Sequence, residues 1–193
     1  ARATGKSEFK GNIATEWGNS NEANAIVDYQ TITGNKVDAS GLHVHKDYTW
    51  LAGSPDGLVG TDGMIEVKCP FYRKRDGSSR VHKTIPAHYY CQVNALLEIL
   101  DRKWCDYICW TPEGMAIYRI HRDASAFDFF LTFYGQFYAA MAAGAGKAPA
   151  LGGEDKRKII QRMGAYLSDV DHDLWKAAID DTQKGVRWSP DEE

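Results

Sequence analysis

Hydrophobic residues recur at helical spacing in four stretches of the chain, which are residues 19–30, 86–100, 123–143 and 154–184. Pro86 suits the first turn of the second stretch, and Asp123 or Ser125 is a candidate N-cap for the third. A linker of Gly, Ala and Pro at residues 144–153 separates the third stretch from the fourth. The pattern therefore predicts three helices in the main body of the protein and charged helical segments near its end.

Between the first two helices the pattern changes to short alternating runs, and two more runs follow the second helix; they are residues 42–45, 58–59, 64–68, 104–110 and 115–120. Turn residues at 54–57 and 61–63 separate the earlier runs. In the run 64–68, the period of two places Glu66 and Lys68 on the same face of a strand. This order of elements predicts an α/β (α+β) fold, with a mixed sheet flanked by helices.

The size and composition allow one domain with a small appendage. The chain has 193 residues, of which 44% are hydrophobic and 12% aromatic, enough to form a sizeable core. We assign residues 1–150 to a main domain and residues 151–193 to a helical C-terminal extension, packed on that domain or on a neighbouring subunit. No apolar run is long enough to span a bilayer and no secretory signal is visible, so we expect a cytoplasmic protein without a membrane segment.

The net charge of −3 counts weakly against a nucleic-acid-binding protein, because phosphate neutralisation usually requires a basic surface. A cluster of catalytic carboxylates and an acidic tail can hide a local basic surface. The basic run at residues 156–158 is one candidate for contact with DNA, although such a run on a helix is usually a solvated face. The aromatic residues between 127 and 138 could stack on bases, but their helical spacing favours a core or a subunit interface.

The candidate chemistry lies in the predicted hairpin. A turn at residues 61–63 would bring the carboxylate of Asp56 close to that of Glu66, and two adjacent carboxylates repel each other unless a cation holds them. Hard oxygen ligands suit Mg²⁺ or Mn²⁺. Lys68 can orient an attacking water molecule and offset charge that develops at phosphorus. The alternative is a Glu66–Lys68 pair on a solvent face, but Asp56 upstream favours a metal-dependent nuclease centre.

These residues match a known signature. Asp56 followed by Glu66, Val67 and Lys68, with Pro55 in front, matches the PD-(D/E)xK nuclease motif. More narrowly, four segments resemble the phage lambda exonuclease family, also called YqaJ-type viral recombinases: Trp17-Gly18 with Glu22, and residues 54–58, 66–71 and 89–93. The resemblance covers about residues 16 to 120 in consistent order and spacing, and the four motifs together are specific.

The resemblance implies a PD-(D/E)xK core and assigns roles at its centre. Asp56, Glu66 and the backbone carbonyl of Val67 would hold the principal Mg²⁺, for which Mn²⁺ is a possible substitute. Glu22 would help to bind a second ion, whereas periodicity alone describes it as a glutamate at the edge of an amphipathic face. Lys68 would position and activate the nucleophilic water.

The resemblance also implies a set of substrate-binding residues. Gln92 would contact substrate or metal-bound water, and Tyr89, one turn earlier, would support it. Ser54 matches a serine of the family that receives the terminal 5′-phosphate. The arginine and serine that complete this pocket would lie nearer the N-terminus, where Arg2 and Ser7 are the candidates.

The function implied by the resemblance is a Mg²⁺-dependent 5′-to-3′ exonuclease. It would degrade one strand of linear double-stranded DNA to 5′-mononucleotides and leave a 3′ overhang for a single-strand annealing protein in phage recombination. The protein would assemble as a homotrimer ring. Two alternatives stay open, a structure- or sequence-specific DNA endonuclease on the same core and a non-catalytic DNA-end-binding subunit.

Overall fold

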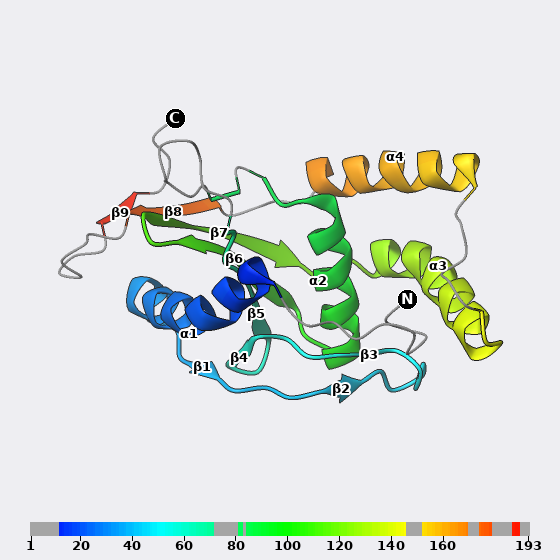
Figure 1. Ribbon diagram of the computed structural model, residues 1–193, viewed down its shortest axis with the longest axis horizontal. Coiled ribbons are helices and arrows are strands. Elements are labelled where there is room, and N and C mark those ends of the chain that lie inside the picture. The colour runs from blue at the N-terminus through cyan, green and yellow to red at the C-terminus, as the bar shows by residue number, and fades with distance from the viewer. Residues whose placement is uncertain are drawn as a thin grey trace.

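The computed structural model describes residues 12–71, 81–82, 84–145, 152–169, 174–178 and 187–189, with side chains up to residue 163. The strands are β1 Val37–Asp38, β2 His43–Val44, β3 Ala52–Gly53, β4 Gly57–Val59, β5 Gly63–Lys68, β6 Trp104–Thr111, β7 Gly114–His121, β8 Leu174–Ala178 and β9 Arg187–Ser189. In this part of the chain, seven of them form one sheet in the order β1-β4-β5-β6-β7-β8-β9, and β2 pairs with β3 (Figure 1). Only β5 and β6 run parallel, so the sheet is mixed, as predicted.

The described residues contain four helices, α1 Ile13–Thr33, α2 Ala87–Leu100, α3 Ala124–Ala142 and α4 Gly153–Asp169. Helices α1 and α2 contact the sheet, and α3 and α4 pack on α2. Helix α1 starts before the predicted stretch because the Asn12 side chain caps it, accepting a hydrogen bond from the amide of Thr15, and it ends at Gly34 with φ of 70°. Asp123 caps α3 by accepting hydrogen bonds from the amides of Ser125 and Ala126. This cap confirms one of the two predicted candidates.

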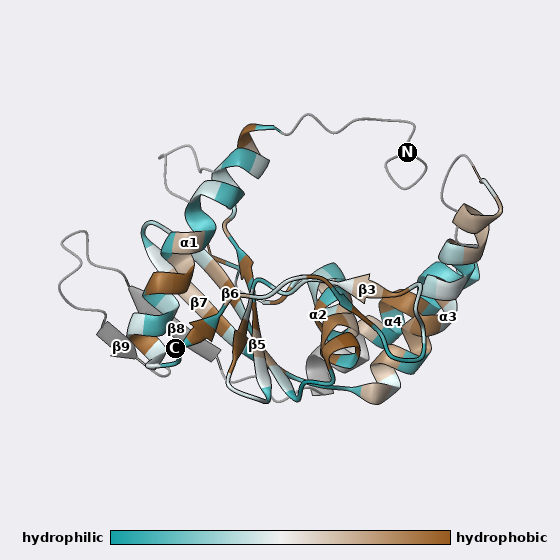
Figure 2. Cartoon of the chain, turned by 90° about the horizontal axis from the view of Figure 1, so that it is seen from below, coloured by the Kyte–Doolittle hydropathy of each residue, from teal (hydrophilic) through white to brown (hydrophobic). Residues whose placement is uncertain are grey.

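Alternating residues of the central strands face two hydrophobic clusters on opposite sides of the sheet. Ile65 and Val67 of β5 pack in the cluster that includes Tyr29 of α1. Met64 of β5 and Tyr107 of β6 pack in the other cluster, with α2 and α3. Figure 2 shows the hydrophobic colouring of these central strands. Because β5 is buried on both faces, a charged side chain on it needs partners within the protein.

Polar side chains beneath α1 fix it to the sheet. The Tyr29 hydroxyl donates to Asp106 Oδ2 at 2.6 Å, and Arg119 holds the same carboxylate through two hydrogen bonds of 2.8 and 2.9 Å. Trp110 Nε1 donates to Asp28 Oδ2 at 2.7 Å. Both contacts join the C-terminal half of α1 to β6, the strand next to β5.

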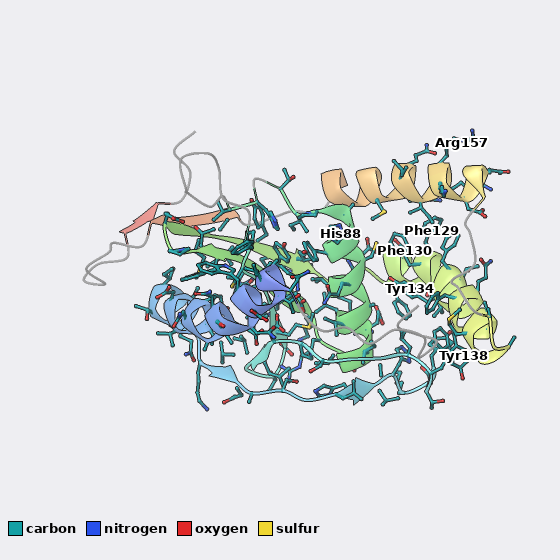
Figure 3. All side chains as sticks on the ribbon, viewed as in Figure 1. His88, Phe129, Phe130, Tyr134, Tyr138 and Arg157 are labelled. Carbon is teal, nitrogen blue, oxygen red and sulfur yellow. The ribbon has the colours of Figure 1, made fainter. Side chains whose placement is uncertain are left out.

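The aromatic side chains of α3 pack mainly within the chain. Phe130 is buried in the cluster around α2, and Phe129, Phe133 and Tyr134 are partly buried against it (Figure 3). Tyr138, further along α3, stacks on Trp50 with a distance of 5.1 Å between ring centroids. The prediction of a core role is confirmed for the first part of the helix.

Two features differ from the sequence-based expectation. The helical spacing in residues 86–100 predicts one buried stripe, formed by Tyr89, Val93, Leu96 and Leu100. Val93 and Leu96 are buried as predicted, but Tyr89 and Leu100 are only partly buried, and Tyr90 and Leu97 are buried as well. The buried surface is wider than one stripe because the sheet, α3 and α4 all contact α2. Residues 174–178 form strand β8 where we predict a helix. The exposed edge of β7 offers backbone hydrogen bonds to this segment, and such pairing overrides a weak helical pattern.

The C-terminal extension contacts the main body of the same chain through α4 against α2 and β8 against β7. The division of the chain at residue 150 stays a prediction. None of the helices in the described ranges combines the length and the apolar character that a membrane crossing requires.

Gly63 allows the start of β5 to lie against Trp104. A Cβ atom at position 63 would lie 2.2 Å from the Trp104 ring. We expect Gly63→Ala to lower the free energy of unfolding by about 2 kcal/mol, as measured by urea denaturation, because the ring must shift. Gly135→Ala is the control, since a Cβ there meets nothing within 4 Å, and it should cost nothing. Equal stability of the two variants would contradict this packing.

Candidate active site

The antiparallel pairing of β4 and β5 brings Asp56 beside Glu66. Gly57 pairs with Ile65, and the same register continues one residue further to place Asp56 opposite Glu66. The Asp56 amide donates to the Ile65 carbonyl at 3.2 Å, and Asp56 Oδ2 accepts a hydrogen bond of 2.6 Å from the Val67 amide. The backbone of β5 therefore fixes the position of the Asp56 carboxylate, as the predicted hairpin requires.

Glu66 is the most deeply buried acidic residue of this site, with 2% of its surface exposed. Its Oε1 forms an ion pair with Lys68 and accepts a hydrogen bond of 2.6 Å from Gln92 Nε2. Its Oε2 is buried and has no hydrogen-bond partner in the described part of the chain. A buried carboxylate oxygen without a partner is costly, so the arrangement favours a cation at this oxygen.

The electrostatics of the cluster agree with this interpretation. Burial and the neighbouring charge of Asp56 raise the pKa of Glu66 to about 7. Burial also raises the pKa of Asp56, although the Val67 amide and Lys68 oppose the change. Burial alone would lower the pKa of Lys68, but the charges of Glu66 and Asp56 outweigh it and raise that pKa. One ammonium group is thus shared by two buried carboxylates.

Glu22 belongs to the same cluster although it comes from α1. Its side chain is half-buried, and its pKa is raised by burial and then by Asp56, while Lys68 opposes the change. With Glu22 included, three carboxylates interact electrostatically with the ammonium group of Lys68, and Glu66 pairs with it directly. When ionised they carry an excess of negative charge that a divalent cation would neutralise.

A cavity of about 840 Å³ opens at the carboxyl end of β5, and residues of α1 and the start of α2 also line it. The residues that line it are Ala14, Thr15, Gly18, Asn19, Glu22, Asp56, Val67, Lys68, Cys69, Pro70, Phe71, His82 and Tyr89. Lys68 Nζ lies 5.0 Å from the centroid of the Tyr89 ring, a cation–π contact on the wall of the cavity. Glu22, Asp56 and Lys68 of the cluster therefore face the cavity, whereas Glu66 lies buried behind them.

The donor atoms fit a hard divalent cation with open coordination positions. In the ranges that the structure describes, no three His, Cys, Asp or Glu side chains are grouped closely enough to form a complete metal site. Mg²⁺, however, is commonly held by one or two carboxylates, with water and substrate phosphate as the other ligands. Asp56 and the unpartnered oxygen of Glu66 supply two such carboxylates.

The structure brings most of the predicted site residues together, but not all of them. Gln92 and Tyr89 contact Glu66 and Lys68, respectively. Ser54 is exposed and is not among the residues that line the cavity. The two N-terminal candidates for a 5′-phosphate pocket, Arg2 and Ser7, lie outside the described residues.

The basic run at residues 156–158 lies on α4, and none of its residues lines the cavity. All three side chains are exposed, and Lys158 forms an ion pair of 2.7 Å with Glu154. Figure 3 shows Arg157 on the outer side of α4. These features are those of a solvated helix face.

His82 and Phe71 line the cavity although we predict no role for them from the sequence. Phe71 directly follows the strand that carries Glu66 and Lys68, and its ring packs 6.0 Å from that of Trp17. His82 has no motif around it that would identify it, because its position depends on contacts with β6 and β7. The sequence could have indicated Phe71 through its closeness to β5, but it offers no such indication for His82.

The family described as the YqaJ-like viral recombinase domain matches residues 1–103. The crystal structure of an alkaline exonuclease from Laribacter hongkongensis is similar, with 28% identity, a TM-score of 0.54, and coverage of 86% of this chain and 80% of that chain. Its complex with dAMP gives a TM-score of 0.57 at the same identity and coverage.

A curated relative, an uncharacterized protein of Acanthamoeba polyphaga mimivirus, is 29% identical over 112 residues. That match covers 52% of this chain and 20% of the relative, so it spans about a fifth of the relative's length.

Glu66→Gln should change how the stability of the metal-free protein depends on pH. The pKa of Glu66 rises from 4.5 to about 7 on folding, so the folded protein retains a proton that the unfolded chain releases between these values. The free energy of unfolding should therefore fall as pH rises through this interval, by an amount on the order of 3 kcal/mol.

The glutamine variant should lose most of this decrease, since it has no proton to release at position 66. Denaturation in the presence of a chelator at about pH 5 and about pH 8 measures the difference. The same pH dependence in both proteins would contradict the burial of an ionisable carboxyl at this position.

Proposed function

Because the chain belongs to the YqaJ-like viral recombinase domain family, we propose that it is a divalent-metal-dependent deoxyribonuclease. The observation that carries the proposal is the buried pair of Asp56 and Glu66 beside Lys68, with one Glu66 oxygen left without a partner among the described residues. The similarity to the alkaline exonuclease from Laribacter hongkongensis supports it.

Asp56, Glu66 and the Val67 carbonyl would hold a Mg²⁺ ion, with Mn²⁺ as a substitute, and Glu22 would help to hold a second ion. When bound, the metal supplies positive charge that favours loss of a proton from water and offsets charge developing at phosphorus. The unpartnered Glu66 oxygen and the excess of carboxylates support this assignment.

Lys68 acts on the attacking water and on the phosphate. Its ammonium group is held by Glu66 and lies over the Tyr89 ring, so its position is fixed before substrate binds. A fixed ammonium group can orient water by hydrogen bonding and can stabilise the charge of the pentacoordinate transition state. The raised pKa keeps Lys68 protonated at neutral pH, so its role is that of a donor and not of a base.

Gln92 orients the carboxylate of Glu66. Its amide donates to Oε1, the oxygen that also receives Lys68, which leaves Oε2 as the oxygen available to a cation. We assign Gln92 and its neighbour Tyr89 a second role in contacting the substrate. Ser54 would receive the terminal 5′-phosphate.

The substrate would be linear double-stranded DNA. The protein would degrade one strand from its 5′ end to 5′-mononucleotides and leave a 3′ overhang for a single-strand annealing protein during recombination. The resemblance to the phage lambda exonuclease family supports this direction, and it also supports a homotrimer ring around the DNA. The existence of a complex of the Laribacter hongkongensis exonuclease with dAMP supports a mononucleotide product.

The direct test uses linear and covalently closed circular duplexes of the same sequence with Mg²⁺. We expect digestion of the linear duplex only, with loss of the strand whose 5′ end is accessible and a preference for a 5′-phosphate over a 5′-hydroxyl. Lys68→Ala should lower the rate by about 10³-fold or more. Lys36→Ala, which removes an exposed lysine that does not line the cavity, is the matched control and should be fully active.

Cutting of closed circles would favour the endonuclease alternative. Binding of linear duplex without hydrolysis, in wild type and control alike, would favour a non-catalytic DNA-end-binding subunit. Unchanged hydrolysis by Lys68→Ala would remove this lysine from the mechanism.

Glu22→Ala tests the second ion separately. Removing this carboxylate should raise the Mg²⁺ concentration needed for half-maximal activity by about tenfold, because one ligand is lost while Asp56 and Glu66 remain. Glu16→Ala, an exposed glutamate earlier in α1, is the control. Identical Mg²⁺ titrations for the Glu22 and Glu16 variants would exclude Glu22 from the metal centre.

A further inference from the structure

We infer that His82 is a substrate-binding residue, which donates a hydrogen bond from its Nε2–H to a phosphate oxygen of the DNA strand in the cavity. The inference rests on the proposed nuclease function and extends it to a residue outside the motif of Asp56, Glu66 and Lys68. Its basis is that His82 lines the same cavity as Asp56 and Lys68.

Three contacts hold His82 in place. Its backbone amide donates to Cys109 Sγ at 3.1 Å, and its carbonyl accepts from the Tyr118 hydroxyl at 2.5 Å. Its ring Nδ1 lies 2.8 Å from the Tyr107 hydroxyl. These partners belong to β6 and β7, so the imidazole is fixed to the sheet that carries the metal-binding carboxylates.

The contact with Tyr107 determines which ring nitrogen carries the proton. Tyr107 is fully buried, and its hydroxyl has no other hydrogen-bond partner in the described part of the chain. A buried hydroxyl requires an acceptor, and His82 Nδ1 is the one within reach. A neutral imidazole that accepts at Nδ1 carries its hydrogen on Nε2. The ring therefore presents a fixed N–H donor on its other side.

The surroundings keep this ring neutral. Burial lowers the pKa of His82, and the nearby His88 and Lys68 lower it further. The charged or titratable groups that face it come from β5, β6, β7 and α2; they are Lys68, Tyr107, Cys109, Tyr118, His88 and Tyr89. The donor is thus present at neutral and alkaline pH without adding a charge.

The place of the ring in the cavity suits a phosphate. His82 stacks against Tyr89 with 6.0 Å between centroids and an interplanar angle of 27°, and the Tyr89 ring also contacts Lys68 Nζ. Since Nδ1 is turned toward the buried Tyr107, Nε2 is the polar ring atom left for the cavity. His82 and Lys68 therefore present two donors beside the same tyrosine.

The charge of the cavity explains why a neutral donor is useful. Its lining includes Glu22 and Asp56 but, among the described residues, only Lys68 as a lysine or arginine. A phosphodiester accepts hydrogen bonds and donates none, so a fixed N–H group matches it. A hydrogen bond to a charged acceptor contributes about tenfold or more to affinity.

Two substitutions at position 82 separate the cavity-facing donor from the Tyr107 contact. In His82→Asn, the side-chain amide can take the place of Nδ1 beside Tyr107 but is too short to reach the position of Nε2. In His82→Gln, the amide nitrogen can reach the position of Nε2 and donate to the phosphate. We expect His82→Asn to lower kcat/KM on linear duplex by about tenfold and His82→Gln to retain most of it. The loss should be the same for duplexes of different terminal sequence, because a phosphate carries no base information.

Binding is measured separately in the Lys68→Ala background, where hydrolysis does not interfere. Fluorescence anisotropy with a 5′-phosphorylated duplex should show about tenfold weaker binding when His82→Asn is added, and near-normal binding with His82→Gln. His88→Asn is the control. His88 is exposed and does not line the cavity, although its ring centroid lies 4.1 Å from that of Tyr89. It should behave as the parent protein.

Wild-type affinity in His82→Asn would overturn the inference. Equal losses in the Asn and Gln variants, accompanied by equal losses of thermal stability, would show a purely structural role and would also overturn it. Failure of the wild-type protein to hydrolyse any DNA would instead contradict the proposed function, and the affinity measurement would still decide the role of His82.

Discussion

Glu66 lies on a strand that is buried on both faces, and one oxygen of its carboxylate receives both Lys68 and Gln92 while the other has no partner in the described residues. Placing this carboxylate beside Asp56 in a buried position is unfavourable unless positive charge compensates for it. Lys68 supplies part of that charge. The remaining deficit is the reason why we propose a divalent cation here, and the neighbouring elements hold these groups together.

Each neighbouring element contributes one constraint. The β4–β5 register fixes Asp56 against the Val67 amide, α2 brings Gln92 to Glu66, and α1 brings Glu22 to the rim of the cavity. The position of α1 depends in turn on the hydrogen bond from Tyr29 to Asp106 beneath it. Hydrophobic clusters pack on both faces of the sheet, so the charged groups of β5 are held in a well-packed part of the structure.

The sequence was most informative where local chemistry determines geometry. Alternation in β5 correctly placed Glu66 and Lys68 on one face, and turn residues between β4 and β5 predicted the approach of Asp56. Glu22 was uncertain from periodicity, because its place depends on how α1 packs on the sheet, and only the resemblance to a nuclease family pointed to it. The functional roles of these residues remain proposals.

Features that depend on distant contacts were missed. Strand β8 forms through pairing with the edge of β7, which a helical pattern in residues 154–184 does not reveal. The buried surface of α2 is wider than the predicted stripe, because α3 and α4 contact it in addition to the strands. His82 reaches the cavity only through hydrogen bonds with Tyr107, Tyr118 and Cys109, all at least 25 residues away in sequence.

The central claim is that Asp56 and Glu66 together create a site for a divalent cation. Calorimetric titration of the chelator-treated protein with Mn²⁺, in the absence of DNA, measures this directly. We expect saturable binding to the wild-type protein and at least about tenfold weaker binding to Asp56→Asn, which preserves the size of the side chain but removes its charge. Equal affinity and stoichiometry in the two proteins would contradict the account.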